Sequence, residues 1–140
     1  MLRRTALVAA VAAASVALSA AATAQAAPAR DVQITSRMKA FAAARTPAAA
    51  CKTMSSAFQM HLGGGSTAKC ATGMPASLAR FVRTHKRGLK IVKLGFTQGQ
   101  GVVTARIGGG AATKYYFDHQ RNGWWLNSIG AIQPHPPGEA

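Results

Sequence analysis

The spacing of apolar residues changes at Leu89, and this change constrains the fold more than any other feature of the sequence. From Leu89 onward apolar and polar residues alternate in four runs, LKIVKLGFT, GVVTARI, TKYYFDHQ and WWLNSIGAI, which are separated by QGQ, GGGAA and RNG. Connections this short join antiparallel neighbours. The sequence therefore predicts a four-stranded meander, with its strongest hairpin signal at Asn122-Gly123.

Before Leu89 the apolar residues recur every three or four positions, which predicts three helices. Their N-terminal signals are Asp31, Thr46-Pro47 and Pro75, and glycines at 63–65 and 88 end the second and third helices. In the first helix the spacing places most of the apolar residues on one face. The apolar residues of the three helices are Val32, Ile34, Met38, Phe41 and Ala42; Ala50, Met54, Phe58 and Leu62; and Leu78, Phe81, Val82 and His85. We expect an α+β domain in which three N-terminal helices pack on a curved antiparallel sheet.

The N-terminus has the layout of a secretory signal peptide. Arg3 and Arg4 precede an uncharged run over residues 6–22, and Ala24-Gln25-Ala26 suits signal peptidase. An uncleaved anchor is disfavoured, because the run is mostly Ala rather than Leu or Ile. The predicted organisation is a cleaved signal peptide at 1–26, one domain at 27–133 and a flexible tail at 134–140, in a secreted or cell-envelope protein.

Cys51 and Cys70 are the only cysteines. In an oxidising compartment two cysteines most simply form a disulfide, which would close a loop of roughly 20 residues and stabilise the domain by about 3 kcal/mol. A metal site is disfavoured because the two lack CxxC spacing, and a catalytic thiol is disfavoured because no activating group is near in sequence. We expect no metal and no cofactor.

The order of these elements resembles a known superfamily. A leading helix, then ACKTMSSAFQMHLGGGSTAKC, a third helix and a final hairpin YYFDHQRNGWWLNSI are similar to small exported actinobacterial members of the nuclear transport factor 2-like superfamily. The resemblance covers about residues 32–132 and implies a cone-shaped α+β barrel with an apolar pocket. The superfamily includes ketosteroid isomerases, polyketide cyclases and non-catalytic binding domains, so the fold does not choose the function.

The first functional hypothesis is a non-enzymatic domain that binds a small apolar ligand or a partner segment, as a monomer or a homodimer. Within the implied cone, the expected lining is Phe58, Tyr115, Phe117, Trp124 and Leu126. The alternative for these residues is ordinary core packing, since aromatic side chains fill cores more often than they mark ligands.

The second hypothesis is a small enzyme of the isomerase or cyclase type, which needs a titratable base inside the pocket. The candidates are Asp118, His61 and His85. Asp118 points to solvent if the more apolar face of its strand turns inward, and the two histidines lie on or beside apolar stripes, where structural histidines are common.

The third hypothesis follows from a net charge of +14, with 17 Lys and Arg against 3 Asp and Glu. Such a charge attracts anionic envelope polymers, nucleic acid or other anionic surfaces. The candidate basic patch is Arg80, Arg83, Lys86, Arg87 and Lys90. Its alternative interpretation is the solvated face and last turn of a helix.

The adjacent Trp124 and Trp125 point to opposite faces of an extended strand. Because Leu126 shares the face of Trp124, we expect Trp124 to face the core and Trp125 to cover the other side, unless a strand bulge exchanges them.

Overall fold

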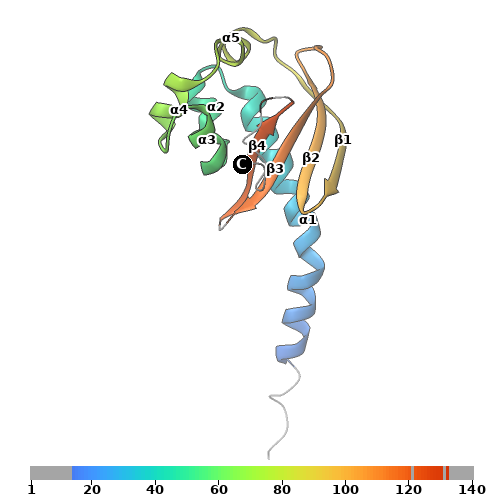
Figure 1. The fold of residues 1–140 in the computed structure, drawn as a ribbon. Helices are drawn as coiled ribbons and strands as arrows, with labels where there is room; N and C mark the ends of the chain where they lie inside the picture. The colour runs from blue at the N-terminus through green and yellow to red at the C-terminus, as the bar shows by residue number, and fades with distance from the viewer. Residues whose placement is uncertain (1–13, 121, 131, 133–140) are drawn as a thin grey trace, which may run out of the picture.

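The computed structural model describes residues 14–120, 122–130 and 132, and the predicted tail at 134–140 lies outside them. Helices come first in the chain and strands follow, which confirms the α+β class (Figure 1). The elements are α1 (Ala14–Ala43), α2 (Pro47–Cys51), α3 (Ser56–Leu62), α4 (Thr67–Gly73), α5 (Ala76–Thr84), β1 (Leu89–Thr97), β2 (Gln100–Ile107), β3 (Thr113–Gln120) and β4 (Gly123–Ile129).

The four strands form one sheet in the order β1-β2-β3-β4, and every neighbouring pair is antiparallel, as predicted. Buried and more exposed residues alternate along β2, where Gly101, Val103, Ala105 and Ile107 are buried. One face of the sheet therefore carries the core, and the opposite face is left without a helix among the described residues. Asn122 lies in the last hairpin turn, while Gly123 begins β4 with a φ of 133°.

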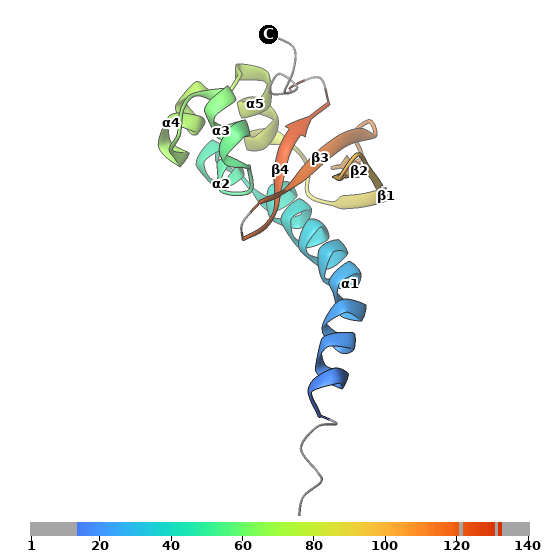
Figure 2. The same ribbon diagram turned by 60° about the horizontal axis from the view of Figure 1, so that its bottom comes forward.

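α1 packs along the covered face of the sheet (Figures 1 and 2). Ile34, Met38 and Phe41 form its buried stripe, with exposures of 0–1%, whereas Val32, which we expected in the same stripe, is 66% exposed because it lies on the other side of the helix. Gly101 of β2 allows this close approach, because a Cβ at that position would lie 2.8 Å from Cδ1 of Ile34. The N-terminal half of α1 projects away from the sheet.

The prediction that Asp31 caps the first helix is wrong. α1 is continuous from Ala14 to Ala43, and Asp31 lies inside it, paired with Arg30 at 3.3 Å between Nε and Oδ1. The residues before Asp31 are mostly alanines, which have the highest helix propensity, so the helix continues through the polar signal instead of beginning there.

The second predicted helix is two helices, because residues 53–55 pair with β4 instead of continuing the helix. The N–H of Leu126 donates to the carbonyl of Thr53 at 3.0 Å, and the N–H of Ser55 donates to the carbonyl of Leu126 at 2.7 Å. Ser55 then caps α3 by accepting from the N–H of Phe58 at 3.1 Å. Met54 and Phe58 are buried as predicted. The spacing of apolar residues therefore predicted which side chains are buried, but not that the helix is interrupted at residues 53–55.

The third predicted helix is shorter than expected and follows an extra one. α5 ends at Thr84, His85 is its C-cap, and Gly88 has a φ of 118° just before β1. The segment around Cys70, which we predicted to be a connection leading into this helix, forms α4 with Ser66 as its N-cap. α4 contacts the end of α3 through backbone, since a Cβ on Gly73 would lie 2.3 Å from the carbonyl oxygen of Leu62. Five helices therefore replace three.

Cys51 of α2 and Cys70 of α4 form the predicted disulfide. Both residues are fully buried, and Sγ of Cys70 lies 3.9 Å from the sulfur of Met54. A buried disulfide indicates an oxidising, non-cytoplasmic compartment. Among the described residues, no helix has both the length and the apolarity that crossing a bilayer requires.

Removing the disulfide should destabilise the helical half. For Cys51→Ala combined with Cys70→Ala, we expect the free energy of unfolding to fall by about 3 kcal/mol, because the unfolded chain regains the entropy of the open loop. Urea unfolding followed by circular dichroism measures this. A reductant should produce a similar loss in the wild type and none in the variant. Equal stabilities of wild type and variant would contradict the assignment.

Candidate functional site

Four of the five predicted pocket residues lie in the core. Phe58, Tyr115, Phe117 and Leu126 are 0–3% exposed and belong to one cluster of buried side chains. The rings of Tyr115 and Phe41 lie 5.8 Å apart between centroids. Solvent reaches almost none of this surface, so these residues act in packing between the sheet and the helices.

The fifth, Trp124, is partly buried at the end of the covered face. It packs against the core, as expected, with its ring centroid 5.9 Å from that of Phe96 and 5.2 Å from that of His119. Trp125 follows Trp124 in β4 and points away from the core, and the guanidinium carbon of Arg37 from α1 lies 3.7 Å from its ring centroid. A bulge does occur in β4, but it follows Leu126 and so leaves the two tryptophans in their expected order.

The three candidate acid–base residues lie on different elements, and no hydrogen bond joins any two of them in the described part of the chain. Asp118 is half-buried on the uncovered face and accepts a hydrogen bond from Nε2 of Gln100 at 2.8 Å. His61 is exposed in the last turn of α3. Within the described ranges, no group of three His, Cys, Asp or Glu side chains is arranged to hold a metal ion.

His85 joins the C-terminal ends of two helices. Its Nδ1 lies 2.9 Å from the carbonyl oxygen of Phe81 in α5, and its Nε2 lies 2.7 Å from that of Ala42 in α1. A guanidinium N–H of Arg45 donates to the carbonyl of His85. These contacts hold the segment that follows α5 beside the end of α1.

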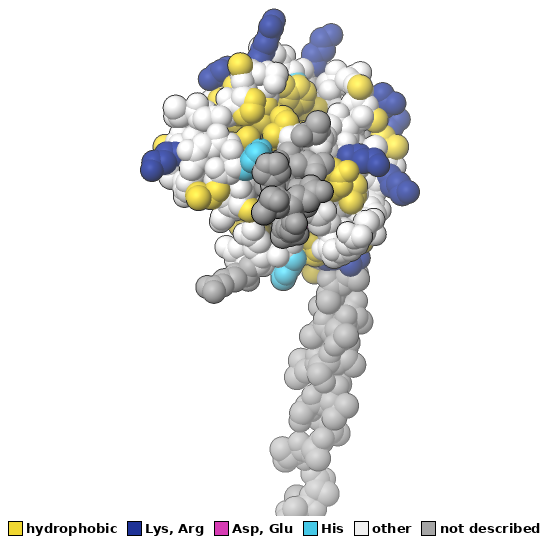
Figure 3. All heavy atoms as spheres, viewed as in Figure 1, with side chains coloured by type: hydrophobic (Ala, Val, Ile, Leu, Met, Phe, Trp, Pro, Cys, Tyr) yellow, Lys and Arg dark blue, Asp and Glu magenta, His cyan; other side chains and the backbone are white. Residues whose placement is uncertain are grey.

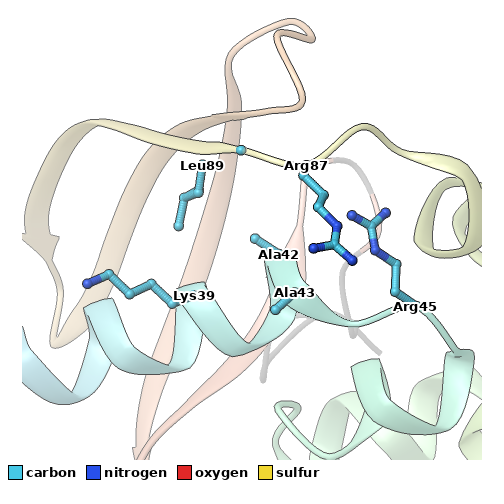
Figure 4. A pocket seen from close by; sticks show the side chains of 7 residues that line it. Lys39, Ala42, Ala43, Arg45, Arg87 and Leu89 are labelled. Atoms are coloured by element: carbon cyan, nitrogen blue, oxygen red, sulfur yellow. The ribbon is translucent and has the colours of Figure 1, made fainter.

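That segment and the end of α1 enclose a pocket of about 330 Å³ (Figure 4). Figure 4 shows the side chains of Arg45 and Arg87 pointing toward each other at one end, and Lys39 at the other end near Leu89. Apolar surface lies between these ends. The lining residues are Lys39, Ala42, Ala43, Arg45, Arg87, Gly88 and Leu89.

The charge of this pocket is not balanced by carboxylates among the described residues. The two described acidic side chains are engaged elsewhere, since Asp31 pairs with Arg30 and Asp118 accepts from Gln100. Arg87 is exposed and has no hydrogen-bond or ion-pair partner in the described part of the chain. Arg45 uses one donor on His85, and a guanidinium has five. An anion placed between the two guanidinium groups would be attracted by both.

The predicted basic patch is divided by the fold. Arg80 and Arg83 are exposed on α5, Lys86 is exposed in the loop, Arg87 lines the pocket, and Lys90 lies in β1 on the uncovered face of the sheet. Sequence reasoning did not consider Lys39 and Arg45. Their position around Ala42 and Ala43 is visible in the sequence, but only the tertiary contact through His85 brings Arg87 beside them.

Comparison with known proteins assigns no family, since no family model, no curated protein and no solved structure matches this chain.

The buried phenol of Tyr115 should make the domain sensitive to alkali. Burial raises the pKa of Tyr115 from 10.0 to about 12, and a hydrogen bond with Thr113 opposes this shift. The unfolded phenol ionises from pH 10 upward while the folded one keeps its proton. The free energy of unfolding should therefore fall between pH 10 and 12, by up to about 1.4 kcal/mol per pH unit.

Urea unfolding across this pH range should show a shallower loss of stability for Tyr115→Phe than for the wild type. Tyr116→Phe is the matched control, because Tyr116 lies half-buried on the other face and should retain the wild-type slope. The same slope in Tyr115→Phe and wild type would contradict the assignment.

Proposed function

We propose that this protein is an exported, non-enzymatic domain that binds a small anion with an apolar body in the pocket between α1 and β1. The observation that carries the proposal is the pair Arg45 and Arg87, whose guanidinium groups face each other with no carboxylate of the described residues between them (Figure 4). This site differs from the interior of a cone, where the sequence led us to expect the ligand.

The proposed ligand follows from the lining. A carboxylate or a phosphate monoester accepts paired N–H bonds from guanidinium groups, and such charge-assisted bonds are stronger than neutral ones. Ala42, Ala43 and Leu89 offer an apolar floor for a short hydrocarbon body. A volume of about 330 Å³ is at the small end of ligand sites, which favours a small molecule over a chain segment.

The absence of catalysis is part of the proposal and rests on the position of the candidate bases. A general base must reach its proton at hydrogen-bond distance. Asp118 lies on the other face of the sheet, and both ring nitrogens of His85 lie against carbonyl oxygens. Membership of the nuclear transport factor 2-like superfamily stays a prediction, and the α+β architecture is compatible with it.

Export through a signal peptide at 1–26 is the second part of the proposal. Its support is the charged, apolar and small-residue layout of that segment together with the Cys51–Cys70 disulfide. The projection of the N-terminal half of α1 away from the sheet is compatible with its removal (Figure 2).

Replacing one guanidinium with a carboxylate should weaken the selective binding of an anion. Hexyl phosphate is a suitable probe, with hexanol as its uncharged counterpart, and calorimetry measures the affinity. We expect hexyl phosphate to bind and hexanol not to bind. Arg87→Glu should lower the affinity for hexyl phosphate by about tenfold or more, because an attractive charge-assisted hydrogen bond is replaced by repulsion between two negative charges.

Arg83→Glu is the matched control, since Arg83 is equally exposed on α5 outside the pocket and the charge change is the same. It should bind hexyl phosphate within about threefold of the wild type. Equal losses in both variants would mean that net charge alone attracts the probe, and the pocket would then be rejected.

Secretion from an expressing cell should yield a chain that begins at Ala27, as measured by intact mass and N-terminal sequencing. The chain 27–140 should unfold at the temperature of the full chain, because the core cluster of the described residues begins at Ile34. A secreted product that retains Arg3 and Arg4 would contradict the signal-peptide proposal.

A further inference from the structure

The face of the sheet without helices is basic. Lys90 of β1, Arg106 of β2 and Lys114 of β3 lie on it, because their strand neighbours Leu89, Ala105 and Tyr115 turn toward the core. Lys93 of β1 lies on it as well, because it pairs with Thr104, which pairs with Lys114. All four are exposed. In Figure 3, Lys and Arg side chains gather over β1 and β2, and no acidic side chain is seen among the atoms described in that view.

These positively charged side chains are neighbours across the strands. Lys90 lies directly opposite Arg106 in the β1–β2 register, and Thr104 lies between Lys93 and Lys114 in the next row. Like charges opposite each other destabilise a sheet. The carboxylate on this face among the described residues, Asp118, is hydrogen-bonded to Gln100 instead of to a lysine. The arrangement therefore lowers the stability of the free domain and would be relieved by an anion.

A groove of about 460 Å³ crosses the same face. It forms where Gly95 of β1 has no side chain, and a Cβ there would meet nothing within 4 Å. Val102 and Tyr116 lie beside Gly95 in register and make its floor. The polar groups at its sides are those of Lys93, Thr97, Gln100, Thr104 and Lys114.

We propose that this groove docks a linear anionic glycan. Lys93 and Lys114 lie two strands apart, roughly 10 Å, and so can bind successive anionic groups of a polymer. The hydroxyl and amide groups of Thr97, Thr104 and Gln100 can exchange hydrogen bonds with sugar hydroxyls. The disulfide indicates an oxidising, non-cytoplasmic compartment, which favours a glycan over nucleic acid as the occupant.

A second copy of this chain is a poor occupant of the face. A two-fold interface would bring Lys90, Lys93, Arg106 and Lys114 against the same four residues of the partner. Their repulsion would not be offset, since Asp118 is the acidic side chain available on this face within the described residues. The proposal is independent of the anion pocket, which lies on the other side of β1.

The test uses the secreted chain with its disulfide, a heparin octasaccharide as the probe and calorimetry at about 0.15 M salt. The face variant is Lys93→Glu with Lys114→Glu. The helix variant, Arg80→Glu with Arg83→Glu on α5, changes the net charge equally and is the matched control. We expect the face variant to lose about tenfold or more in affinity and the helix variant to stay within about threefold.

A second variant tests the groove without changing the charge. Gly95→Gln fits the folded strand, because the space around Gly95 is open, and its side chain would fill the groove. We expect a loss of about threefold or more in heparin affinity with an unchanged melting temperature. Circular dichroism of each variant shows that the fold is retained.

Three results would overturn the proposal. Equal losses in the face and helix variants would indicate attraction by net charge alone. Full affinity in Gly95→Gln would indicate that the groove is not used. An oligothymidylate of matched charge that binds more tightly than heparin, and loses affinity in the face variant, would assign the face to nucleic acid instead.

Discussion

The pairing of residues 53–55 with β4 is the contact on which the arrangement of the two halves depends. Two backbone hydrogen bonds join Thr53 and Ser55 to Leu126, and Oγ of Ser55 donates to Oδ1 of Asn127 at 2.7 Å. This short bridge occupies part of the outer edge of β4, which would otherwise expose unpaired backbone groups. It also interrupts the helix between Cys51 and Phe58. The interruption separates α2, which carries Cys51 of the disulfide, from α3. The helical half is thereby attached to the strand half by backbone as well as by side chains.

Packing on the covered face explains why function is to be sought elsewhere. Phe41, Phe58 and Phe117 are fully buried there with Leu126, and the aromatic residues first considered as pocket lining are part of this core. Charged side chains remain outside it, because burying an unpaired cation is far more costly than leaving it in water. Positive charge therefore remains on the surface, and part of it lies in the pocket beside the end of α1 and on the uncovered face of the sheet.

Most of the secondary structure could be predicted from local signals. The four strands, their order and the pairing of Cys51 with Cys70 follow from alternation, short connections and the count of cysteines. The helices were predicted less well. Burial of Met54 and Phe58 fits a continuous helix, and nothing in the spacing indicates that Thr53 and Ser55 bond to a strand seventy residues later. Asp31 likewise has the chemistry of a cap, but the alanines before it favour helix.

The sequence by itself determined most of the buried residues, which strands are neighbours and how much positive charge the surface must carry, because these depend on periodicity, loop length and composition. Only the tertiary structure decided where that charge lies. Arg45 and Arg87 meet because His85 binds a carbonyl at the end of α1, and the lysines of β1 and β3 align because the strand register places Thr104 between them. Both arrangements depend on contacts between residues distant in the chain, on which local spacing carries no information.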